Sequence, residues 1–311
     1  MDFLVTGGAG FIGSHLIAGL LERGHQVRAV DDFSSGKRAN LAPFQERIDF
    51  IEGDLADPAV CRRVCDGVRV IFHEAAVPSV PKSIADPEAS HRANIQGTFN
   101  MLQAAREAGV KRFVSAASSS AYGESPTLPK IESMPTSPLS PYAVQKLAGE
   151  QYCRVFALCY GLETISLRYF NVFGPRQDPK SQYAAAIPAF VTAILADRPP
   201  TIYGDGEQTR DFTYIDNVIN ANLLAAEAPK TNGEIVNIAC GEHVTVNEII
   251  ARINKLAGKT VRPNYVDPRT GDIKHSWADI QLAEKVIGFR PTVTFDEGLE
   301  RTVKWYSESA A

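Results

Sequence analysis

The segment 114–146 constrains this chain more than any other. An apolar run there ends on three serines at 118–120, and after a proline-rich stretch a helical pattern carries Tyr142 and Lys146. A tyrosine and a lysine four residues apart lie on one face of a helix, so the ammonium can lie near the phenol. A phenol titrates near pH ~10, and a neighbouring cation favours the phenolate that acts as a general base. The segment therefore predicts proton-transfer chemistry beside a hydride acceptor.

The N-terminus predicts a site for that acceptor. Residues 2–6 are typical of a buried strand, residues 7–13 read GGAGFIG, and residues 14–23 favour a helix. The glycines fit GxGxxG at 8–13 and its three-spaced variant at 7–13. Small residues at such a turn let a helix N-terminus approach a pyrophosphate. Glycine-rich turns are common, but the strand–turn–helix context favours a dinucleotide site here.

A second strand, expected at 26–30, leads into Asp31 and Asp32, about 20 residues beyond the glycines. A carboxylate at this point binds the adenosine ribose hydroxyls and repels a 2′-phosphate, which favours NAD over NADP. Acidic residues that merely flank a turn are the alternative interpretation.

Alternating elements from residue 1 to about 168 predict a Rossmann-like, doubly wound parallel sheet with helices on both faces. Strands expected at 48–52 and 69–73 lead into Asp54-Leu55 and into Ala75-Ala76. The carboxyl ends of these strands should converge at one edge, together with the glycine turn, Ser118 and Tyr142. We expect an NAD-binding catalytic domain at 1–168. A smaller α/β lobe at 169–311 should bind substrate and return some segments to the main sheet.

Helices are expected at 61–66, 87–108 and 140–160, and in the second lobe at 183–197, 218–227 and 246–256, with a strand at 201–203. The helices 87–108 and 140–160 could form a four-helix contact in a homodimer, although solvent-facing helices are the alternative. The loop 123–141 contains five prolines, and a structureless loop of this length is usually functional.

The net charge of −4 argues against a nucleic-acid partner. No apolar run approaches 18 residues, and the chain starts directly with a strand, so a soluble cytoplasmic protein without a membrane contact is expected. The six histidines are dispersed, and a metal site is not predicted. All five cysteines are interpreted as packing residues: Cys61, Cys65, Cys153, Cys159 and Cys240.

Taken together, the motifs closely resemble the extended short-chain dehydrogenase/reductase family, and within it the UDP-hexose 4-epimerases. The resemblance covers essentially the whole chain. Its motifs are TGGAGFIG at 6–13, the serines before Tyr122-Gly123, the Tyr142/Lys146 pair, LRYFN at 167–171, Arg210-Asp211-Phe212 and Arg269-x-Gly271-Asp272.

The resemblance implies that Tyr142 is the base, that Lys146 lowers the pKa of Tyr142 and holds the nicotinamide ribose, and that Ser118 binds the reacting oxygen. It also implies that NAD stays tightly bound and is regenerated in each turnover. The implied cofactor contacts are Gly7, Gly10, Phe11, Ile12, Gly13, Asp31, Asp32, Asp54, Leu55, Ala75, Ala76, Asn94, Tyr142 and Lys146.

For the UDP-sugar, the resemblance implies that Asn171, Arg210 and Arg269 hold the pyrophosphate. Arginine suits phosphate because its planar fork matches two oxygens. Tyr203 is expected to stack on uracil and Asp272 to bind the uridine ribose. The remaining implied substrate contacts are Lys82, Ser118, Ser119, Ser120, Tyr142, Ala186 and Ser276.

Two departures bear on the substrate. Sugar 4,6-dehydratases of this family carry Asp and Glu where this chain has Ser119 and Ser120, so dehydration is not expected. Epimerases restricted to non-acetylated sugars carry a bulky tyrosine where this chain has Ser276, and a small residue there leaves room for an N-acetyl group.

The sequence therefore predicts an NAD-dependent 4-epimerase of UDP-glucose/UDP-galactose that also accepts UDP-GlcNAc/UDP-GalNAc. A UDP-glucuronate 4-epimerase or decarboxylase remains an alternative, with Lys82 as the nearby cation. A dinucleotide-sensing scaffold protein is the non-enzyme alternative, although such proteins typically lose the Tyr/Lys pair.

Overall fold

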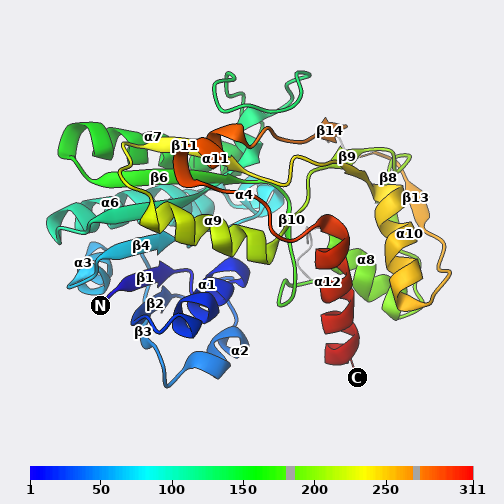
Figure 1. The fold of residues 1–311 in the computed structure, drawn as a ribbon, viewed down its shortest axis with the longest axis horizontal. Helices are drawn as coiled ribbons and strands as arrows, with labels where there is room; N and C mark the ends of the chain where they lie inside the picture. Colours follow the sequence, from blue (N-terminus) through cyan, green and yellow to red (C-terminus); the bar gives the residue numbers. More distant parts are fainter. Residues whose placement is uncertain (180–185, 269–273, 311) are drawn as a thin grey trace.

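A seven-stranded parallel sheet forms the centre of the molecule (Figure 1). The computed structural model describes residues 1–179, 186–268 and 274–310. The strand order is β11-β6-β5-β4-β1-β2-β3, and every neighbouring pair is parallel. The strands are β1 (Phe3–Thr6), β2 (Val27–Asp31), β3 (Asp49–Glu52), β4 (Val70–His73), β5 (Arg112–Ser118), β6 (Glu163–Tyr169) and β11 (Glu234–Ile238). The predicted Rossmann-like class is confirmed.

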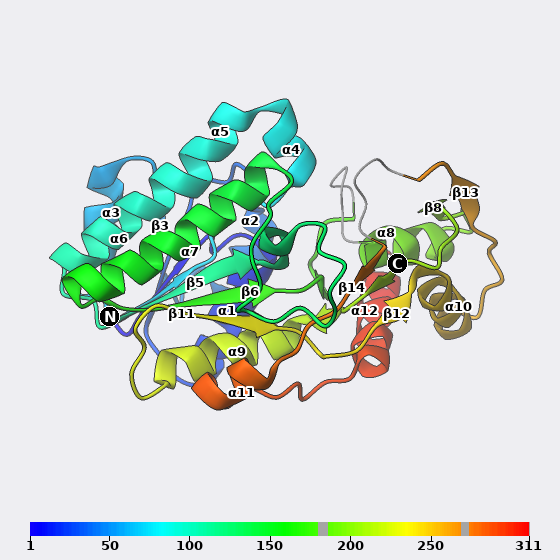
Figure 2. The ribbon, with the colours of Figure 1, turned by 90° about the horizontal axis from the view of Figure 1, so that it is seen from above.

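Helices cover both faces of this sheet (Figure 2). One face carries α3 (Pro58–Cys65), α5 (Pro87–His91), α6 (Gly97–Glu107) and α7 (Pro141–Tyr160), and the other carries α1 (Phe11–Glu22), α9 (Ile215–Glu227) and α11 (Gln281–Ile287). Successive strand residues serve opposite faces. Accordingly, Leu4 packs in the cluster beneath α3, α6 and α7, whereas Phe3 and Val5 pack with α1 and α9.

A smaller group of elements extends beyond the carboxyl ends of the strands (Figure 1). It contains α8 (Ala186–Leu195), α10 (Val246–Ala257), α12 (Phe295–Ala310) and short strands, and the C-terminus lies at the end of α12. The short strands are β7 (Val172–Phe173), β8 (Thr201–Tyr203), β9 (Thr209–Arg210), β10 (Thr213–Tyr214), β12 (Val244–Thr245), β13 (Asn264–Val266) and β14 (His275–Ser276).

The remaining short helices lie in the connections. They are α2 (Arg38–Leu41), η1 (Ala42–Phe44), α4 (Val80–Ala85), η2 (Arg92–Gln96) and η3 (Ser119–Tyr122). Within the described ranges, no helix combines the length and apolarity that a membrane crossing requires.

Two sequence expectations need correction. The helix expected at 87–108 is α5, a π-helical turn at 92–96 and α6 in succession. π-helical turns occur mostly as single-turn bulges inside α-helices, and the apolar spacing over 87–108 did not indicate one. The cysteines also differ from expectation, because Cys159 is exposed on α7 and Cys240 is half-buried, whereas the other three are buried.

Candidate active site

The carboxyl ends of β4, β5 and β6 meet the first turns of α7, and this meeting point is called the catalytic corner below. Ser118 is the last residue of β5 and lies opposite Tyr169 of β6 in the parallel register. Glu74 directly follows β4. Adjacent parallel strands end at the same edge of a sheet, and this brings residues far apart in the sequence together.

The start of α7 is fixed from several directions. Ser140 caps the helix by accepting a hydrogen bond from the Ala143 amide at 3.2 Å, and Pro141 occupies the first turn. The Tyr142 amide donates to the Ser83 hydroxyl at 3.1 Å. That hydroxyl in turn donates to the Val80 carbonyl at 2.6 Å. The backbone of Tyr142 is therefore anchored to α4, a contact that the sequence analysis did not predict.

The protonation of Tyr142 differs from expectation. Burial raises the pKa of the phenol, a hydrogen bond from Ser118 lowers it, and the Glu74 charge raises it. The net shift of the Tyr142 pKa is therefore upward, whereas the sequence led us to expect a lowered pKa. The ammonium of Lys146 donates to the Ala116 carbonyl at 2.8 Å. Burial lowers the pKa of Lys146, and the Glu74 carboxyl opposes that shift.

The serines at 118–120 also line the catalytic corner. The Ser120 hydroxyl donates to the Ser118 hydroxyl at 2.8 Å, and the Ser120 amide donates to it at 3.2 Å. Ser119 begins the short helix η3 and is half-buried. The Ser118 hydroxyl therefore accepts two hydrogen bonds, and it can donate its own hydrogen to the phenol oxygen of Tyr142.

The glycine turn has the geometry that an anion-binding helix start requires. Gly7 has φ +65°, and a Cβ there would lie 2.8 Å from the Ala75 backbone. A Cβ on Gly13 would lie 2.2 Å from the Gly7 carbonyl oxygen. Helix α1 begins at Phe11 without a side-chain cap. Its first amides, on Phe11, Ile12 and Gly13, therefore remain available to oxygens of a phosphate.

Asp31 organises the loops around this turn. Its carboxylate accepts from the Ala9 amide at 2.9 Å and from the Phe33 amide at 2.8 Å. Burial raises the pKa of Asp31, and these two amides oppose the shift. Asp32 is exposed and accepts from the Ser34 amide at 2.9 Å. Asp31 therefore lies at the predicted strand end, with a structural task besides any contact with a ribose.

Other predicted cofactor residues line the same edge. Asp54 accepts from Arg92 at 2.5 Å, and the adjacent Leu55 is buried. The Ala75 amide donates to Thr6 at 3.1 Å, and Ala76 follows it, half-buried.

The amide of Asn94 is engaged within the protein. Its oxygen accepts from the Val77 amide at 2.8 Å, and its nitrogen donates to Gln145 at 2.8 Å. Asn94 lies in the π-helical turn. This geometry favours a positioning role for Asn94 over direct contact with a cofactor.

The predicted sugar-side residues gather on short strands. Ser276 of β14 lies opposite Arg210 of β9 in the parallel register. The guanidinium of Arg210 donates to the Thr209 carbonyl at 2.8 Å and to the Lys274 carbonyl at 3.2 Å. Tyr203 ends β8 and is 37% exposed. These elements form the sugar-side face, defined as β8, β9 and β14.

Asp211 ties this face to the main sheet, a role that the sequence analysis missed. Its fully buried carboxylate accepts from the amides of Cys240, Gly241 and Ala278 at 2.9, 3.0 and 3.3 Å. Burial raises the pKa of Asp211 to about 7, and the three amides oppose the shift. Asn171, with φ +29°, donates to the Asp211 carbonyl at 2.9 Å.

The other predicted substrate contacts do not lie on the sugar-side face as the structure describes it. Lys82 is exposed on α4, and Ala186 is the half-buried first residue of α8. Arg269 and Asp272 lie outside the described residues.

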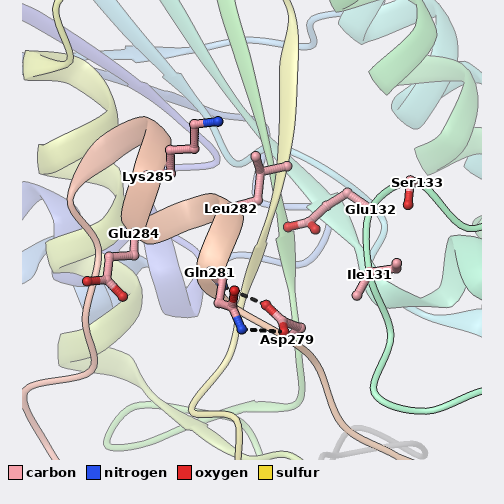
Figure 3. Close-up of a pocket in the computed structure, with 8 residues that line it drawn as sticks. All are labelled: Ile131, Glu132, Ser133, Asp279, Gln281, Leu282, Glu284 and Lys285. Atoms are coloured by element: carbon pink, nitrogen blue, oxygen red, sulfur yellow. Dashed lines mark hydrogen bonds between the residues drawn. The ribbon is translucent and has the colours of Figure 1, made fainter.

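The loop 123–141 is anchored at its middle. The Lys130 amide donates to the Trp277 carbonyl at 2.9 Å, and the Asp279 amide donates to the Lys130 carbonyl at 3.0 Å. Glu132 accepts from the Asn237 amide at 2.7 Å. A pocket of about 830 Å³ lies between this loop and α11 (Figure 3). Its lining residues are Ile131, Glu132, Ser133, Asp279, Gln281, Leu282, Glu284 and Lys285, which do not include the catalytic corner.

Comparison with known proteins gives a family match over most of the chain. Residues 3–239 match the NAD dependent epimerase/dehydratase family. A UDP-glucose 4-epimerase of Mycolicibacterium smegmatis is 38% identical over 98% of both chains. A UDP-glucuronate 4-epimerase of Thermodesulfobacterium geofontis is 34% identical over 99% of this chain and 96% of its own.

Two solved structures show the same architecture. The UDP-glucose 4-epimerase of Thermotoga maritima, solved with UDP-glucose, superposes with a TM-score of 0.95 and 37% identity over 100% of both chains. The UDP-N-acetylglucosamine 4-epimerase of Methanobrevibacter ruminantium, in complex with UDP-N-acetylmuramic acid, gives 0.94 and 42%, covering 99% of this chain and 98% of its own.

Proposed function

This chain belongs to the NAD dependent epimerase/dehydratase family, and from that premise we propose that it is a UDP-hexose 4-epimerase. The proposed reaction interconverts UDP-glucose and UDP-galactose, and also UDP-GlcNAc and UDP-GalNAc, through a transient 4-keto sugar. The observation that carries the proposal is the catalytic corner, where Ser118 hydrogen-bonds the Tyr142 phenol and Lys146, one turn further along α7, donates to the Ala116 carbonyl of β5.

The proposed cofactor is NAD, retained between turnovers. The glycine turn fits a pyrophosphate because Gly7 and Gly13 have no room for a Cβ and the first turn of α1 is uncapped. Asp31 fits a ribose with free hydroxyls and disfavours a 2′-phosphate because of its charge. The chemistry that bound NAD supplies is a reversible hydride acceptor, carrying a positive charge in its oxidised form, beside C4 of the sugar.

Tyr142 is the proposed base. It takes the proton of the sugar 4-hydroxyl as the C4 hydride leaves, and the C4–O bond becomes a carbonyl. Tyr142 returns the proton when the hydride comes back to the opposite face of the keto sugar. Ser118 donates to the reacting oxygen, and the Ser120 hydroxyl orients Ser118. No net oxidation occurs, so the proton and the hydride are both restored in each turnover.

Burial alone would keep the Tyr142 phenol protonated at neutral pH, so that it could not accept a proton. Positive charge beside the phenol offsets this, because it favours the phenolate over the phenol. Lys146 is the protein's own cation at this place, held by the Ala116 carbonyl. We assign Lys146 the second task of binding the nicotinamide ribose.

The sugar-side face is the proposed site for the UDP moiety. Arg210 supplies a cation for the pyrophosphate, Asn171 a neutral donor, and Tyr203 an exposed ring for uracil. Ser276 lies opposite Arg210 in the β9–β14 register, which supports a position beside the sugar. Because serine is small, we propose that it leaves room for an N-acetyl group at C2. Arg269 and Asp272 complete the proposed site.

We also propose a homodimer in which α6 and α7 of two copies form a four-helix contact. The outer side of α7 exposes Val144 by 49%, Val155 by 46% and Leu158 by 68%. Phe99 of α6 meets Tyr152 of α7 edge-to-face, with ring centroids 5.4 Å apart. Sedimentation should give twice the chain mass, and Leu158→Glu should reduce it to one chain. A monomeric wild type would contradict the proposed contact.

The test of the function is product formation without added cofactor. Purified protein is incubated separately with UDP-glucose and UDP-GlcNAc, and the products are resolved by proton NMR. Inversion at C4 of both sugars supports the whole proposal. Inversion of UDP-glucose alone removes the N-acetyl part, and no inversion of either sugar contradicts the proposal.

A UDP-glucuronate 4-epimerase is the second candidate. The relative from Thermodesulfobacterium geofontis favours it, and the exposed Lys82 on α4 offers a cation for a C6 carboxylate. Inversion of UDP-glucuronate together with failure on both neutral sugars would favour this candidate.

A further inference from the structure

Two elements, β6 and α9, hold the carboxyl of Glu74 in place through a chain of hydrogen bonds. The Tyr169 hydroxyl of β6 donates to Glu74 Oε1 at 2.7 Å. The Asn222 amide of α9 donates to the same hydroxyl at 2.8 Å and to the Val218 carbonyl at 2.9 Å. Tyr169 and Asn222 are both buried. This chain of hydrogen bonds leaves the carboxyl little freedom to move away from the catalytic corner.

The charges around Glu74 come from the catalytic pair. Lys146 favours ionised Glu74, and ionised Glu74 favours protonated Lys146. The Glu74 charge also raises the pKa of Tyr142. The preceding His73 is buried and hydrogen-bonded to Thr6 and Thr98, and burial lowers its pKa to about 3, so it stays neutral.

A second carboxylate near Lys146 has a different partner. Glu150 accepts two hydrogen bonds from Arg168, at 2.8 and 2.7 Å, so an arginine already balances its charge. Glu74 accepts from a neutral phenol instead. Burial raises the pKa of Glu74 to about 7, and both the Tyr169 hydrogen bond and Lys146 oppose that shift.

Resting on the proposed function, we infer that Glu74 is a positioning residue that sets the proton affinity of Tyr142. A base that takes a proton and gives it back works best when its pKa lies near the working pH. Lys146, one helical turn from Tyr142, and oxidised nicotinamide, when bound, would both lower the proton affinity of the phenolate and so weaken it as a base. Ionised Glu74 offsets part of that effect and keeps Lys146 protonated.

The test compares Glu74→Gln with wild type and with Glu74→Asp, all as NAD-loaded enzyme. Glutamine keeps an oxygen that accepts from Tyr169 and removes the charge, whereas aspartate keeps the charge and shortens the reach. The near-ultraviolet phenolate band is titrated without sugar, and the spectrum of Tyr142→Phe is subtracted to isolate Tyr142. We expect the Tyr142 midpoint to fall by about one pH unit in Glu74→Gln. In Glu74→Asp it should stay closer to wild type.

The acid limb of kcat against pH should move in the same direction. An unchanged midpoint in a folded Glu74→Gln protein that retains NAD would overturn the inference. If that variant does not fold, Tyr169→Phe replaces it. Without the Tyr169 donor, Glu74 stays protonated to higher pH and no longer raises the pKa of Tyr142. The acid limb of kcat should therefore again move to lower pH. An unmoved limb would overturn the inference.

The titration needs no substrate turnover, so the two claims fail separately. A shifted midpoint in a protein that inverts no sugar would contradict the proposed function and leave the effect of Glu74 intact. Epimerisation with an unmoved midpoint would support the proposed function and contradict the inference about Glu74.

Discussion

The catalytic corner and the sugar-side face lie at the same end of the main sheet but are built differently. The corner rests on strands of four to seven residues and on the 20-residue helix α7. The face rests on strands of two or three residues that pair across long intervals, as Arg210 does with Ser276. One region is fixed by regular elements, and the other depends on a few buried polar contacts.

This difference predicts where substitutions do their damage. In the corner, side chains perform chemistry on a frame that survives their removal. On the face, one buried carboxylate, Asp211, holds three amides from two separate segments, so its removal should disturb the frame itself. Changes of specificity should also come from the face, because Tyr203 is exposed and Arg210 and Ser276 are only half-buried.

The largest effect on turnover is expected for Tyr142→Phe in the corner. Loss of the proton acceptor should reduce kcat by roughly 10²–10⁴-fold, while the NAD content and the unfolding transition stay near wild type. The measurement is steady-state kinetics with cofactor released by denaturation and quantified. Activity within about tenfold of wild type would reject Tyr142 as the base.

The next effect is structural and concerns the face. Asp211→Ala leaves three buried amides without an acceptor, which should cost about 3 kcal/mol or more in the free energy of unfolding. Urea unfolding measures this. A cost as small as that of an exposed-surface substitution would show that Asp211 does not organise the face.

The pH dependence of Asp211 gives an independent check. Its pKa is raised from 3.8 to about 7 in the folded state. As pH rises through this window, the unfolded carboxyl ionises first, so the wild type loses stability. Asp211→Asn cannot ionise and should gain on the wild type over the same window. Parallel stability curves from pH 4 to pH 8 would contradict the shifted pKa.

Specificity on the face should change through Ser276→Tyr. The larger side chain should lower kcat/KM for UDP-GlcNAc by roughly tenfold relative to UDP-glucose, because it fills the space beside C2. Ser276→Ala is the matched control and should leave the ratio near wild type. Equal losses on both sugars would show that Ser276 does not gate this space.

The smallest effect is expected at the cofactor edge next to the corner. Asp31→Asn removes the charge that repels a 2′-phosphate and keeps an oxygen for the Ala9 or Phe33 amide. The ratio of NADP to NAD affinity should rise by about tenfold in apoenzyme reconstitution. A wild type purified without cofactor that strictly prefers NADP would refute the role of Asp31.

The sequence predicted the corner well because its signals are local. Strand and helix periodicity placed β1, β4 and α7 within one residue of their observed bounds. Parallel topology then brought Ser118, Tyr142 and Lys146 to one edge. A spacing of four residues on a helix needs no knowledge of distant segments.

What the sequence could not predict depends on distant partners. Glu74 follows β4, Tyr169 ends β6 and Asn222 lies on α9, and only their folded geometry reveals the hydrogen-bond chain. The sign of the pKa shift of Tyr142 was missed because burial outweighs the neighbouring groups. Helix α12 was missed although its signal is local, because Phe295, Leu299, Val303 and Tyr306 recur at helical spacing and pack in the core.

The most direct test of the central claim follows the hydrogen on C4. Epimerisation of UDP-glucose is carried out in D₂O, and the product is examined by proton NMR. Because the hydride leaves C4 and returns within one site, the C4 hydrogen of UDP-galactose should remain protium. Deuterium at C4 of the product would contradict the account, because it would mean exchange with solvent instead of internal hydride return.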